Sequence, residues 1–464
     1  MVSVPAVVIA APASGSGKTT VATGLIGALR RSGHRVAPFK VGPDFIDPGY
    51  HGLAAGRPGR NLDPVLVGEG LIGPLYAHGA AGADIAVIEG VMGLFDGRIG
   101  SADAAPATGS TAHVAGLLGA PVILVVDARG QSHSIAALLH GFSTFDRSTR
   151  IAGVILNRVG SNRHEQVLRQ ACEQAGVTVL GAIPRTDEIE LPTRYLGLVT
   201  ATEYGRRAQC AVEAMTALVA RHVDLTAVRT AATSRAAGAA WDPAAAAGDP
   251  SGRRATVAMA SGRAFTFGYA EHAELLRGAG ADVAVFDPLA DALPDGADAV
   301  VLPGGFPEQF TAELSANDVV RRQIGELARA GAPVHAECAG LIYLVSELDG
   351  HPMCGVLNGS ARFTPNLTLG YRDAVAVAES PLYAVGQRAV GHEFHRTAVT
   401  FTDGYQPAWA YRDSAGNLDA NPAPDGVREG VVHAGVHASY LHTHPAAAPE
   451  AVVRFVTRAA GRRA

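Results

Sequence analysis

The chain has 464 residues, of which 48% are hydrophobic and 17% are charged, and its formal net charge is −5 at pH 7. It is too long for one hydrophobic core, since domains usually hold about 100–200 residues. The small negative charge gives no global attraction for nucleic acid or for an acidic membrane surface. No apolar stretch is long enough to cross a bilayer, and the first residues lack the basic region of a signal peptide. We therefore expect a folded cytoplasmic enzyme without nucleic-acid or membrane partners.

Short apolar runs that favour strands alternate with helical patterns, which is typical of parallel, doubly wound α/β sheets. In the first half the runs are Val4–Ala10, Arg35–Lys40, Asp84–Glu89, Pro121–Asp127, Ile151–Asn157 and Val177–Ile183. In the second half they are Ala255–Ala260, Asp282–Asp287, Asp298–Pro303, Pro333–Glu337 and a strand pair within Val431–His442. The stretch between the halves is rich in Ala, Gly, Ser and Pro, which favours a linker. The sequence thus predicts two doubly wound domains, 1–229 and 254–464, joined by a linker at 230–253.

A Gly- and Ser-rich loop joins the first predicted strand to a predicted helix that ends near Arg31. Backbone N–H groups of such a loop cradle phosphates, while Lys18 would reach the β- and γ-phosphates and Thr19 would bind Mg²⁺. The Walker pattern expects glycine where Pro12 stands, but the strand, loop and helix context is intact. The alternative is a Gly-Ser turn before an ordinary helix. We expect ATP with Mg²⁺ to bind at Ser14, Gly15, Ser16, Gly17, Lys18, Thr19 and Thr20.

Carboxylates follow two further predicted strands, at the sheet edge where open α/β sheets bind ligands. Asp44 lies in a loop bounded by Pro and Gly residues, and Glu89 ends a buried strand before a glycine-rich segment. Because Mg²⁺ prefers oxygen ligands, we expect Asp44 and Glu89 to serve the metal or the substrate. Asp47 and Asp96 could equally be solvated loop residues. Asn157, after another strand, either hydrogen-bonds a purine base or caps a turn.

In the second half, a strand runs into Cys338-Ala339-Gly340 and then into a helical pattern that reaches Leu348. A nucleophile on such a turn has an exposed side chain, and the helix dipole should lower the pKa of the thiol from about 8.5. The sequence therefore predicts a reactive thiolate at Cys338. The other three cysteines carry no metal-ligand spacing, and we expect them in the core; they are Cys172, Cys210 and Cys354.

Cysteine chemistry on an amide also needs an oxyanion hole and a general base. The Gly304-Gly305 turn, together with the N–H group of Ala339, could supply the oxyanion hole. The late segment His442-Thr443-His444 offers two histidines at the end of a strand. We prefer His442 as the base; His444, or a metal site on the pair, is the alternative.

Together these motifs resemble those of one family, the cobyrinic or hydrogenobyrinic acid a,c-diamide synthases, over both predicted domains. The most specific marks are Ser14–Thr20, Lys40–His51, Glu89–Asp96, Asn157–Gly160, Pro303–Glu308, Ala336–Tyr343, Gly391–His395 and Ala438–His442. The resemblance implies an N-terminal P-loop domain similar to dethiobiotin synthetase and a C-terminal class I glutamine amidotransferase domain. Ala339 departs from the family, where a second glycine is common after the nucleophile.

The resemblance also implies residue roles and a reaction. Cys338 would attack the side-chain amide of L-glutamine, His442 would raise its nucleophilicity, and Gly305 would lie in the oxyanion hole. In the other domain, Asp44 and Glu89 would serve the metal and phosphoryl chemistry. A corrinoid polycarboxylate would bind near Phe45, Ile46, Asp47 and Asp96. The implied reaction is ATP- and glutamine-dependent amidation of the a and c carboxylates through acyl phosphates.

Other classes of protein share parts of this pattern. A close enzyme alternative is a synthase for another tetrapyrrole, of the nickel-sirohydrochlorin or cobyric acid type. A regulatory P-loop ATPase with an inactive glutaminase domain would carry a signature lysine where this chain has Ala13. A carboxylase like dethiobiotin synthetase leaves the thiol domain unexplained. The sequence allows a homodimer but does not specify one.

Overall fold

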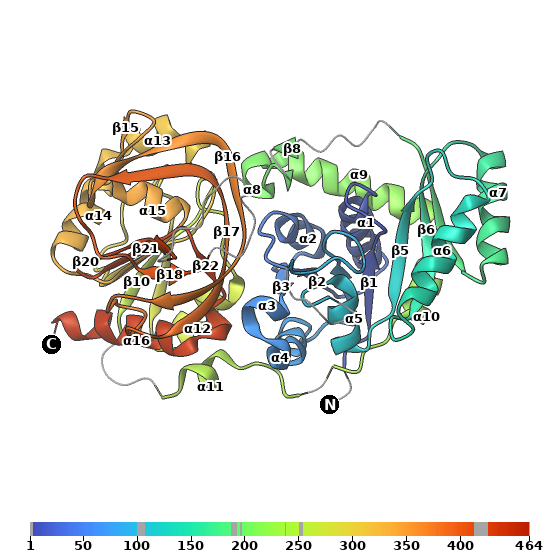
Figure 1. The fold of residues 1–464 in the computed structure, drawn as a ribbon, viewed down its shortest axis with the longest axis horizontal. Coiled ribbons are helices and arrows are strands. Elements are labelled where there is room, and N and C mark those ends of the chain that lie inside the picture. The colour runs from blue at the N-terminus through green and yellow to red at the C-terminus, as the bar shows by residue number, and fades with distance from the viewer. Residues whose placement is uncertain are drawn as a thin grey trace. The chain divides into compact units, whose positions relative to one another are not determined.

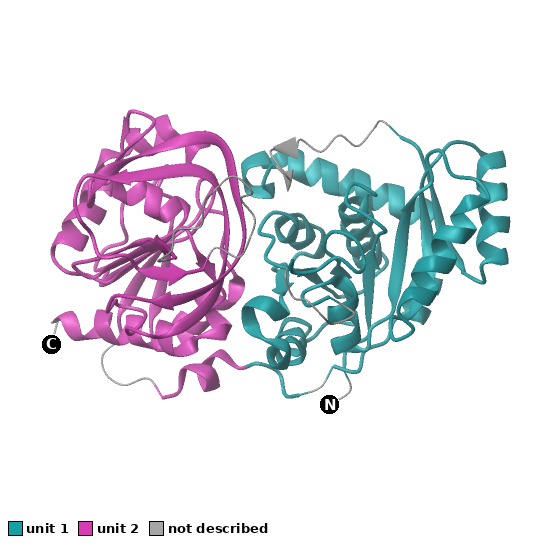
Figure 2. Ribbon diagram, in the orientation of Figure 1, with its two compact units in different colours: residues 1–241 teal, residues 242–464 magenta. Residues whose placement is uncertain are grey.

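The structure is a computed structural model, and it describes residues 3–99, 107–186, 193–194, 197–236, 238–249, 254–412 and 426–463. The chain divides into two compact units, Met1–Trp241 and Asp242–Ala464 (Figure 2). The division falls inside the stretch predicted as a linker, but much of that stretch packs on the units. Thr233 exchanges backbone hydrogen bonds with Ala6, and Trp241 is buried. No helix in the described ranges is both long and apolar enough to pass through a bilayer.

Unit 1 is built on a parallel sheet with the strand order β3-β2-β4-β1-β5-β6-β7 (Figure 1). The central strand β1 is buried along its whole length, which is why its sequence is a continuous apolar run. The strands are β1 (Ala6–Ala10), β2 (Val36–Val41), β3 (Arg60–Leu62), β4 (Ile85–Glu89), β5 (Val122–Asp127), β6 (Ile151–Val159) and β7 (Val179–Pro184), with a separate short pair β8 (Thr193–Arg194) and β9 (Gly197–Leu198).

The chain leaves the centre of this sheet in two directions. β1 leads through α1 to β2 on one side, whereas β4 leads through α5 to β5 on the other. Right-handed crossovers in opposite directions place α1 and α5 on opposite faces, so the predicted doubly wound fold is confirmed. The helices are α1 (Lys18–Arg31), α2 (Asp47–Ala55), α3 (Pro64–Val67), α4 (Glu69–Gly79), α5 (Thr111–Leu118), α6 (Ser134–Phe145), α7 (Asn162–Gln174), α8 (Ala201–Tyr204), α9 (Arg206–His222) and α10 (Leu225–Ala231).

Unit 2 contains a second α/β sheet with the order β11-β10-β12-β13-β21-β20, parallel except for β20. Its strands are β10 (Thr256–Ala260), β11 (Asp282–Phe286), β12 (Ala299–Leu302), β13 (Val334–Glu337), β20 (Val431–His433) and β21 (Val436–Ser439). Its helices are α11 (Pro243–Ala247), α12 (Ala270–Gly278), α13 (Thr311–Ala316), α14 (Asp318–Arg329), α15 (Ala339–Leu344) and α16 (Pro449–Ala460), with short 3-10 turns η1 (Pro307–Gln309), η2 (Pro445–Ala447) and η3 (Gly461–Arg463).

Unit 2 also holds a mostly antiparallel sheet that the sequence did not predict. Its long strands β16 (Leu357–Ala376) and β17 (Arg388–Phe401) form the curved orange ribbons of Figure 1. The other strands are β14 (Val345–Leu348), β15 (His351–Pro352), β18 (Trp409–Tyr411), β19 (Val427–Glu429) and β22 (His442–Thr443). The helix expected to reach Leu348 ends at Leu344, because the next four residues pair with β16 as a strand.

Candidate active sites

The loop after β1 has the shape of a phosphate-binding loop. Gly15 and Gly17 have φ angles of 80° and 96°, a left-handed conformation that residues with a Cβ rarely adopt. A Cβ on Gly17 would lie 2.3 Å from the amide nitrogen of Asn157. Helix α1 begins at Lys18, so the N–H groups of its first turn are available at the loop. Phosphate oxygens are the ligands that such an arrangement favours.

The first turn of α1 meets the end of β4. The hydroxyl of Thr19 donates a hydrogen bond of 2.7 Å to Oε1 of Glu89 and lies 3.4 Å from Oδ2 of Asp47. These hydroxyl and carboxylate oxygens are hard donors of the kind that Mg²⁺ prefers. Within the described ranges no three His, Cys, Asp or Glu side chains form a metal site by themselves. The donor set therefore fits Mg²⁺ only if nucleotide phosphates or water complete the coordination.

The side chain of Lys40 lies among these carboxylates. Its Nζ is 2.7 Å from Oδ2 of Asp47 and 3.0 Å from Oε1 of Glu89, and it is almost fully buried. On the other side of Glu89, His51 Nε2 lies 2.7 Å from Oε2. Both residues fall in the Lys40–His51 segment that marks the family, but the sequence predicts no individual role for either, although a lysine at the end of a buried strand needs carboxylate partners.

This clustering sets the protonation of the site. Burial opposes the ionisation of Glu89, but the charge of Lys40 and the hydrogen bond from His51 hold its pKa below the usual range. Burial and the neighbouring Asp44 raise the pKa of Asp47 above its usual range. Burial, followed by the charge of Lys40, lowers the pKa of Lys18. The charge of Lys40 thus favours the ionised form of Glu89 beside Thr19.

Asp44 contacts its own loop and Lys40. Its Oδ1 accepts hydrogen bonds from the backbone N–H groups of Ile46 and Asp47, and its Oδ2 is 4.0 Å from Lys40. The carboxylate that approaches Thr19 is Asp47, which the sequence assigned to the substrate. We therefore expect Asp47, together with Thr19 and Glu89, to lie close to a bound metal ion.

The remaining residues predicted to bind the substrate have mixed environments. Phe45 is half-buried, and the side chain of Ile46 is buried. Asp96 is exposed and accepts a hydrogen bond of 2.9 Å from the N–H group of Gly93. Phe45 and Asp96 are therefore open to a ligand, whereas Ile46 contributes to the packing of the loop.

Asn157 contacts the phosphate loop. Its amide nitrogen donates to the carbonyl oxygen of Ser16 at 2.9 Å, and its oxygen accepts from the N–H group of Arg158 at 3.0 Å. These contacts fix the phosphate loop and the turn after β6, and a hydrogen bond from Asn157 to a purine base stays a prediction.

In unit 2, Cys338 occupies a sharp turn between β13 and α15. Its φ and ψ angles are 48° and −99°, an uncommon conformation for a residue with a side chain. Such strain is maintained by tight surroundings: a Cβ on Gly340 would lie 2.2 Å from the carbonyl oxygen of Leu302. The predicted turn is present, but the prediction of an exposed side chain is wrong, since Cys338 is 2% exposed.

The electrostatics of Cys338 also differ from the prediction. Burial raises the pKa of the thiol, and Glu308 and Glu337 act in the same direction. Hydrogen bonds from the backbone N–H groups of Gly305 and Ala339 favour the thiolate but do not outweigh burial. The expected lowering of the pKa by the helix dipole is wrong, because α15 is only six residues long and the sulfur is desolvated. The thiol therefore needs a base.

The two N–H groups proposed for the oxyanion hole both act on the thiol. The backbone N–H groups of Gly305 and Ala339 favour the thiolate of Cys338, and the carbonyl oxygen of Phe394 lies 3.9 Å from its sulfur. An amide carbon attacked by the sulfur would hold its oxygen close to the same two N–H groups. This geometry suits acyl transfer to a thiol.

His442 and His444 have different surroundings. His442 is fully buried, its ring lies against Gly304, and its Nδ1 is 3.7 Å from Oε2 of Glu337. The Nδ1 of His444 accepts a hydrogen bond of 3.2 Å from Ala446, and its ring packs on Tyr269 at a centroid distance of 4.3 Å. His444 therefore caps the following turn, and the role of His442 as the base stays a prediction.

The other cysteines are not all in the core. Cys172 is buried, as predicted, and burial raises the pKa of its thiol to about 11. Cys354 is partly buried and packs against the core of unit 2. Cys210 is exposed on α9, so the prediction of a core position is wrong for this residue. The polar face of an amphipathic helix accommodates a small side chain as readily as the core does.

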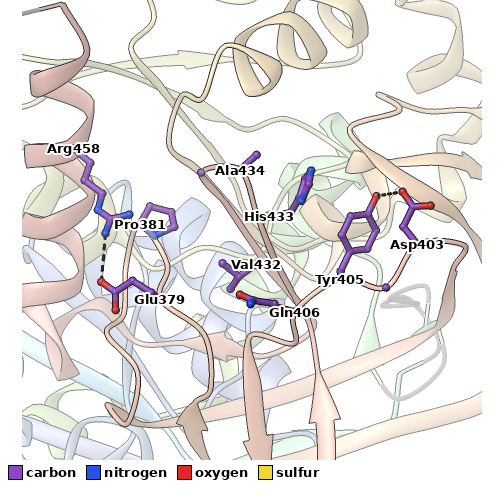
Figure 3. A pocket seen from close by; sticks show the side chains of 11 residues that line it. Glu379, Pro381, Asp403, Tyr405, Gln406, Val432, His433, Ala434 and Arg458 are labelled. Carbon is purple, nitrogen blue, oxygen red and sulfur yellow. Dashed lines mark hydrogen bonds and ion pairs between the residues drawn. The ribbon is translucent and has the colours of Figure 1, made fainter.

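A surface pocket of about 440 Å³ in unit 2 is separate from the thiol site (Figure 3). It is lined by residues 379, 381, 403–406 and 432–435 together with Arg458. Two polar contacts lie along its rim: Arg458 donates to Glu379, and the hydroxyl of Tyr405 donates to Asp403. None of the residues assigned above to the thiol chemistry lines it.

A phosphate-type loop in one unit and a cysteine on a strand-to-helix turn in the other are typical of a class, the P-loop enzymes that carry a glutamine amidotransferase domain. Comparison with known families agrees. Residues 7–199 match the CobQ/CobB/MinD/ParA nucleotide binding domain, and residues 256–449 match the CobB/CobQ-like glutamine amidotransferase domain.

Whole-length relatives identify the family. The chain is 78% identical over 457 residues to the hydrogenobyrinate a,c-diamide synthase of Mycobacterium bovis and 54% identical over 488 residues to that of Streptomyces coelicolor, covering 98% of each chain. It is 38% identical to the cobyrinate a,c-diamide synthase of Synechococcus over 97% of both chains. The chain belongs to the a,c-diamide synthase family and is an amide-forming ligase with a glutamine amidotransferase domain, so the reading as a regulatory ATPase is wrong.

Proposed function

We propose that the chain converts the a and c carboxylates of hydrogenobyrinate into primary amides, with ATP and glutamine, in cobalamin biosynthesis. Support for hydrogenobyrinate, rather than cobyrinate, as the substrate comes from the names of the relatives. Those named for hydrogenobyrinate are 50–78% identical to this chain, whereas the relatives named for cobyrinate quoted in the same comparison are 38–42% identical. The observation that carries the proposal is the pair of sites built on Thr19 and on Cys338.

In the glutaminase half, the sulfur of Cys338 attacks the carbonyl carbon of the glutamine side chain while the thiol proton passes to His442. The oxygen becomes negative beside the N–H groups of Gly305 and Ala339. The C–N bond then breaks, His442 returns the proton, and ammonia leaves a glutamyl thioester on the sulfur. Water attacks the thioester, with its proton passing to His442 and then to the thiolate, and glutamate is released.

In the ligase half, a carboxylate oxygen of the corrinoid attacks the γ-phosphorus of ATP, and the bond to ADP breaks. The acyl phosphate that forms has phosphate as its leaving group, whereas a free carboxylate would have to expel oxide. Ammonia attacks the acyl carbon, loses a proton and displaces phosphate, leaving the amide. Bound Mg²⁺, held by Thr19 and Glu89 with Asp47 close by, would neutralise charge on the phosphates. Lys18 adds a positive charge on the same side.

The direct test is incubation of the purified chain with MgATP, glutamine and hydrogenobyrinate, followed by mass spectrometry of the corrinoid. Two replacements of a carboxylate OH by NH₂, with equal formation of ADP and glutamate, are expected. Cobyrinate and nickel-sirohydrochlorin are run in parallel to distinguish the tetrapyrrole alternatives. Amidation of neither corrinoid under conditions that support ATP binding would overturn the proposal.

A further inference from the structure

A carboxylate lies behind the proposed base of the thiol site. Glu337 directly precedes Cys338, and its Oε2 lies 3.7 Å from Nδ1 of His442. We infer that Glu337 is the positioning residue for His442: it fixes the orientation of the imidazole and stabilises its protonated form during thioester formation. This inference rests on the proposed glutaminase reaction and adds a residue that the sequence did not single out.

The local fold brings the two side chains together. Glu337 is the last residue of β13 and pairs with Ser439 of β21, three residues before His442. The positive φ of Cys338 then turns the chain sharply, so that consecutive residues need not alternate as they do along a strand. The side chains of Glu337 and Cys338 can therefore approach the imidazole of His442 from different sides.

The other oxygen of the carboxylate is fixed by further contacts. Oε1 of Glu337 accepts hydrogen bonds from the N–H and the hydroxyl of Thr443, at 3.1 and 3.2 Å. His335 Nε2 lies 3.5 Å from the same oxygen. With Oε1 held in this way, Oε2 is the oxygen directed at His442. A carboxylate anchored at one oxygen can orient a neighbouring ring through the other.

Glu337 carries a negative charge although it is buried. Burial opposes ionisation, but the neighbouring imidazoles of His335 and His442 hold its pKa well below the usual range. The nearby His272 and His437 do not compete for this charge. Burial lowers the pKa of His272 to about 4 and that of His437 to about 3, so both rings are neutral at neutral pH.

The buried thiol explains why a charged positioning residue matters. Transfer of the Cys338 proton to His442 creates a thiolate and an imidazolium away from water, which is costly without a compensating charge. A carboxylate at Nδ1 stabilises the imidazolium and leaves Nε2, on the opposite side of the ring, for the thiol and the leaving ammonia. The 3.7 Å contact is long for a hydrogen bond, and such contacts commonly shorten when substrate binds.

The test is Glu337→Gln in the full-length chain, assayed with MgATP and hydrogenobyrinate. With glutamine, kcat should fall roughly 10²-fold while KM for glutamine stays within about twofold. With ammonium salt in place of glutamine, the rate of amidation should equal that of the wild type. Alkylation of Cys338 by iodoacetamide should slow in parallel with kcat. A glutamine-dependent kcat equal to that of the wild type would overturn the inference.

Control variants separate positioning from structure. Asp298→Asn makes the same acid-to-amide change at another buried carboxylate of unit 2, before β12 and at the opposite end of the sheet from the thiol. It should keep the glutamine-dependent kcat; a loss equal to that of E337Q would contradict a specific role. Thr443→Val removes one anchor of Oε1 and should lower kcat roughly 3- to 10-fold.

Two further outcomes are decisive. If E337Q loses the ammonium-supported rate as well, the two activities are compared in Glu337→Asp instead. This variant keeps the charge on a side chain one methylene shorter. A roughly tenfold fall in glutamine-dependent kcat with intact ammonium-supported activity supports the inference, and an unchanged kcat overturns it. A wild-type chain that uses ammonium but never glutamine would instead refute the proposed glutaminase, which distinguishes that failure from a failure of Glu337.

Discussion

The hydroxyl of Thr19 donates a hydrogen bond of 2.7 Å to Oε1 of Glu89, and this contact joins the phosphate loop to the end of β4. If the pair holds the metal of bound ATP, Thr19→Val and Glu89→Gln should each lower amidation about 10²- to 10³-fold. The loss should be the same with glutamine and with ammonium, because ATP is needed in both cases. The rate of ADP formation, with glutamine and with ammonium, measures this loss of activity.

Thr23→Val is the matched control for Thr19→Val. Thr23 lies one turn farther along α1 and is fully buried, so the substitution keeps the shape of the helix without touching the loop. Its ADP formation should remain close to that of the wild type. Equal losses in the two valine variants would indicate damage to α1 rather than a role for the Thr19 hydroxyl.

Lys40 should stabilise unit 1 far more than a surface cation does. Lys40→Met leaves Asp47 and Glu89 buried without their common partner, and removing one member of a buried pair costs about 3–5 kcal/mol. Arg35→Met, in the same part of the chain, breaks an ion pair with Asp84 whose side chains are 70% and 39% exposed. That change should lower the stability far less, because water screens the exposed pair. Urea unfolding of both variants checks the difference, and similar midpoints would contradict it.

Glu429 should make unit 2 less stable as the pH rises through neutrality. Burial raises the pKa of its carboxyl from 4.5 to about 7, although Ser439 and Tyr440 donate hydrogen bonds to it. A raised carboxyl pKa means that the folded state holds the proton more tightly. The stabilisation is therefore complete below the unfolded pKa and is lost as the pH rises through the folded value. The loss is no more than about 3 kcal/mol, since part of the residue contacts solvent.

The variant Glu429→Gln should remove this dependence. Relative to the wild type, its free energy of unfolding should be higher at about pH 8 than at about pH 5. Glu347→Gln, at an exposed position on β14, should show the same difference from the wild type at both pH values. Parallel stability curves for the wild type and E429Q would contradict the raised pKa.

The sequence predicts those parts of the molecule whose signals are local. The phosphate loop around Lys18 and the turn at Cys338 each lie in one short segment between a strand and a helix, and the parallel strands are compact apolar runs. The long strands β16 and β17 escaped detection because many of their residues are exposed or half-buried, so no continuous apolar run marks them.

Contacts between distant segments account for the other errors. Lys40 is identified as a site residue only when Asp47 and Glu89 surround it, and the approach of Asp47 to Thr19 joins two segments that are separate in the sequence. The lowered thiol pKa was predicted from the helix alone, whereas the burial of Cys338 depends on packing that a linear pattern does not contain.

The most direct test of the central claim is the substitution Cys338→Ala, followed by measurement of corrinoid amidation with two nitrogen sources. With MgATP and glutamine, we predict no amide product and no release of glutamate. With MgATP and ammonium salt, we predict amidation at the wild-type rate, because the ligase half needs only ammonia. Loss of both activities, or full activity with glutamine, would contradict the assignment of Cys338 as the source of ammonia.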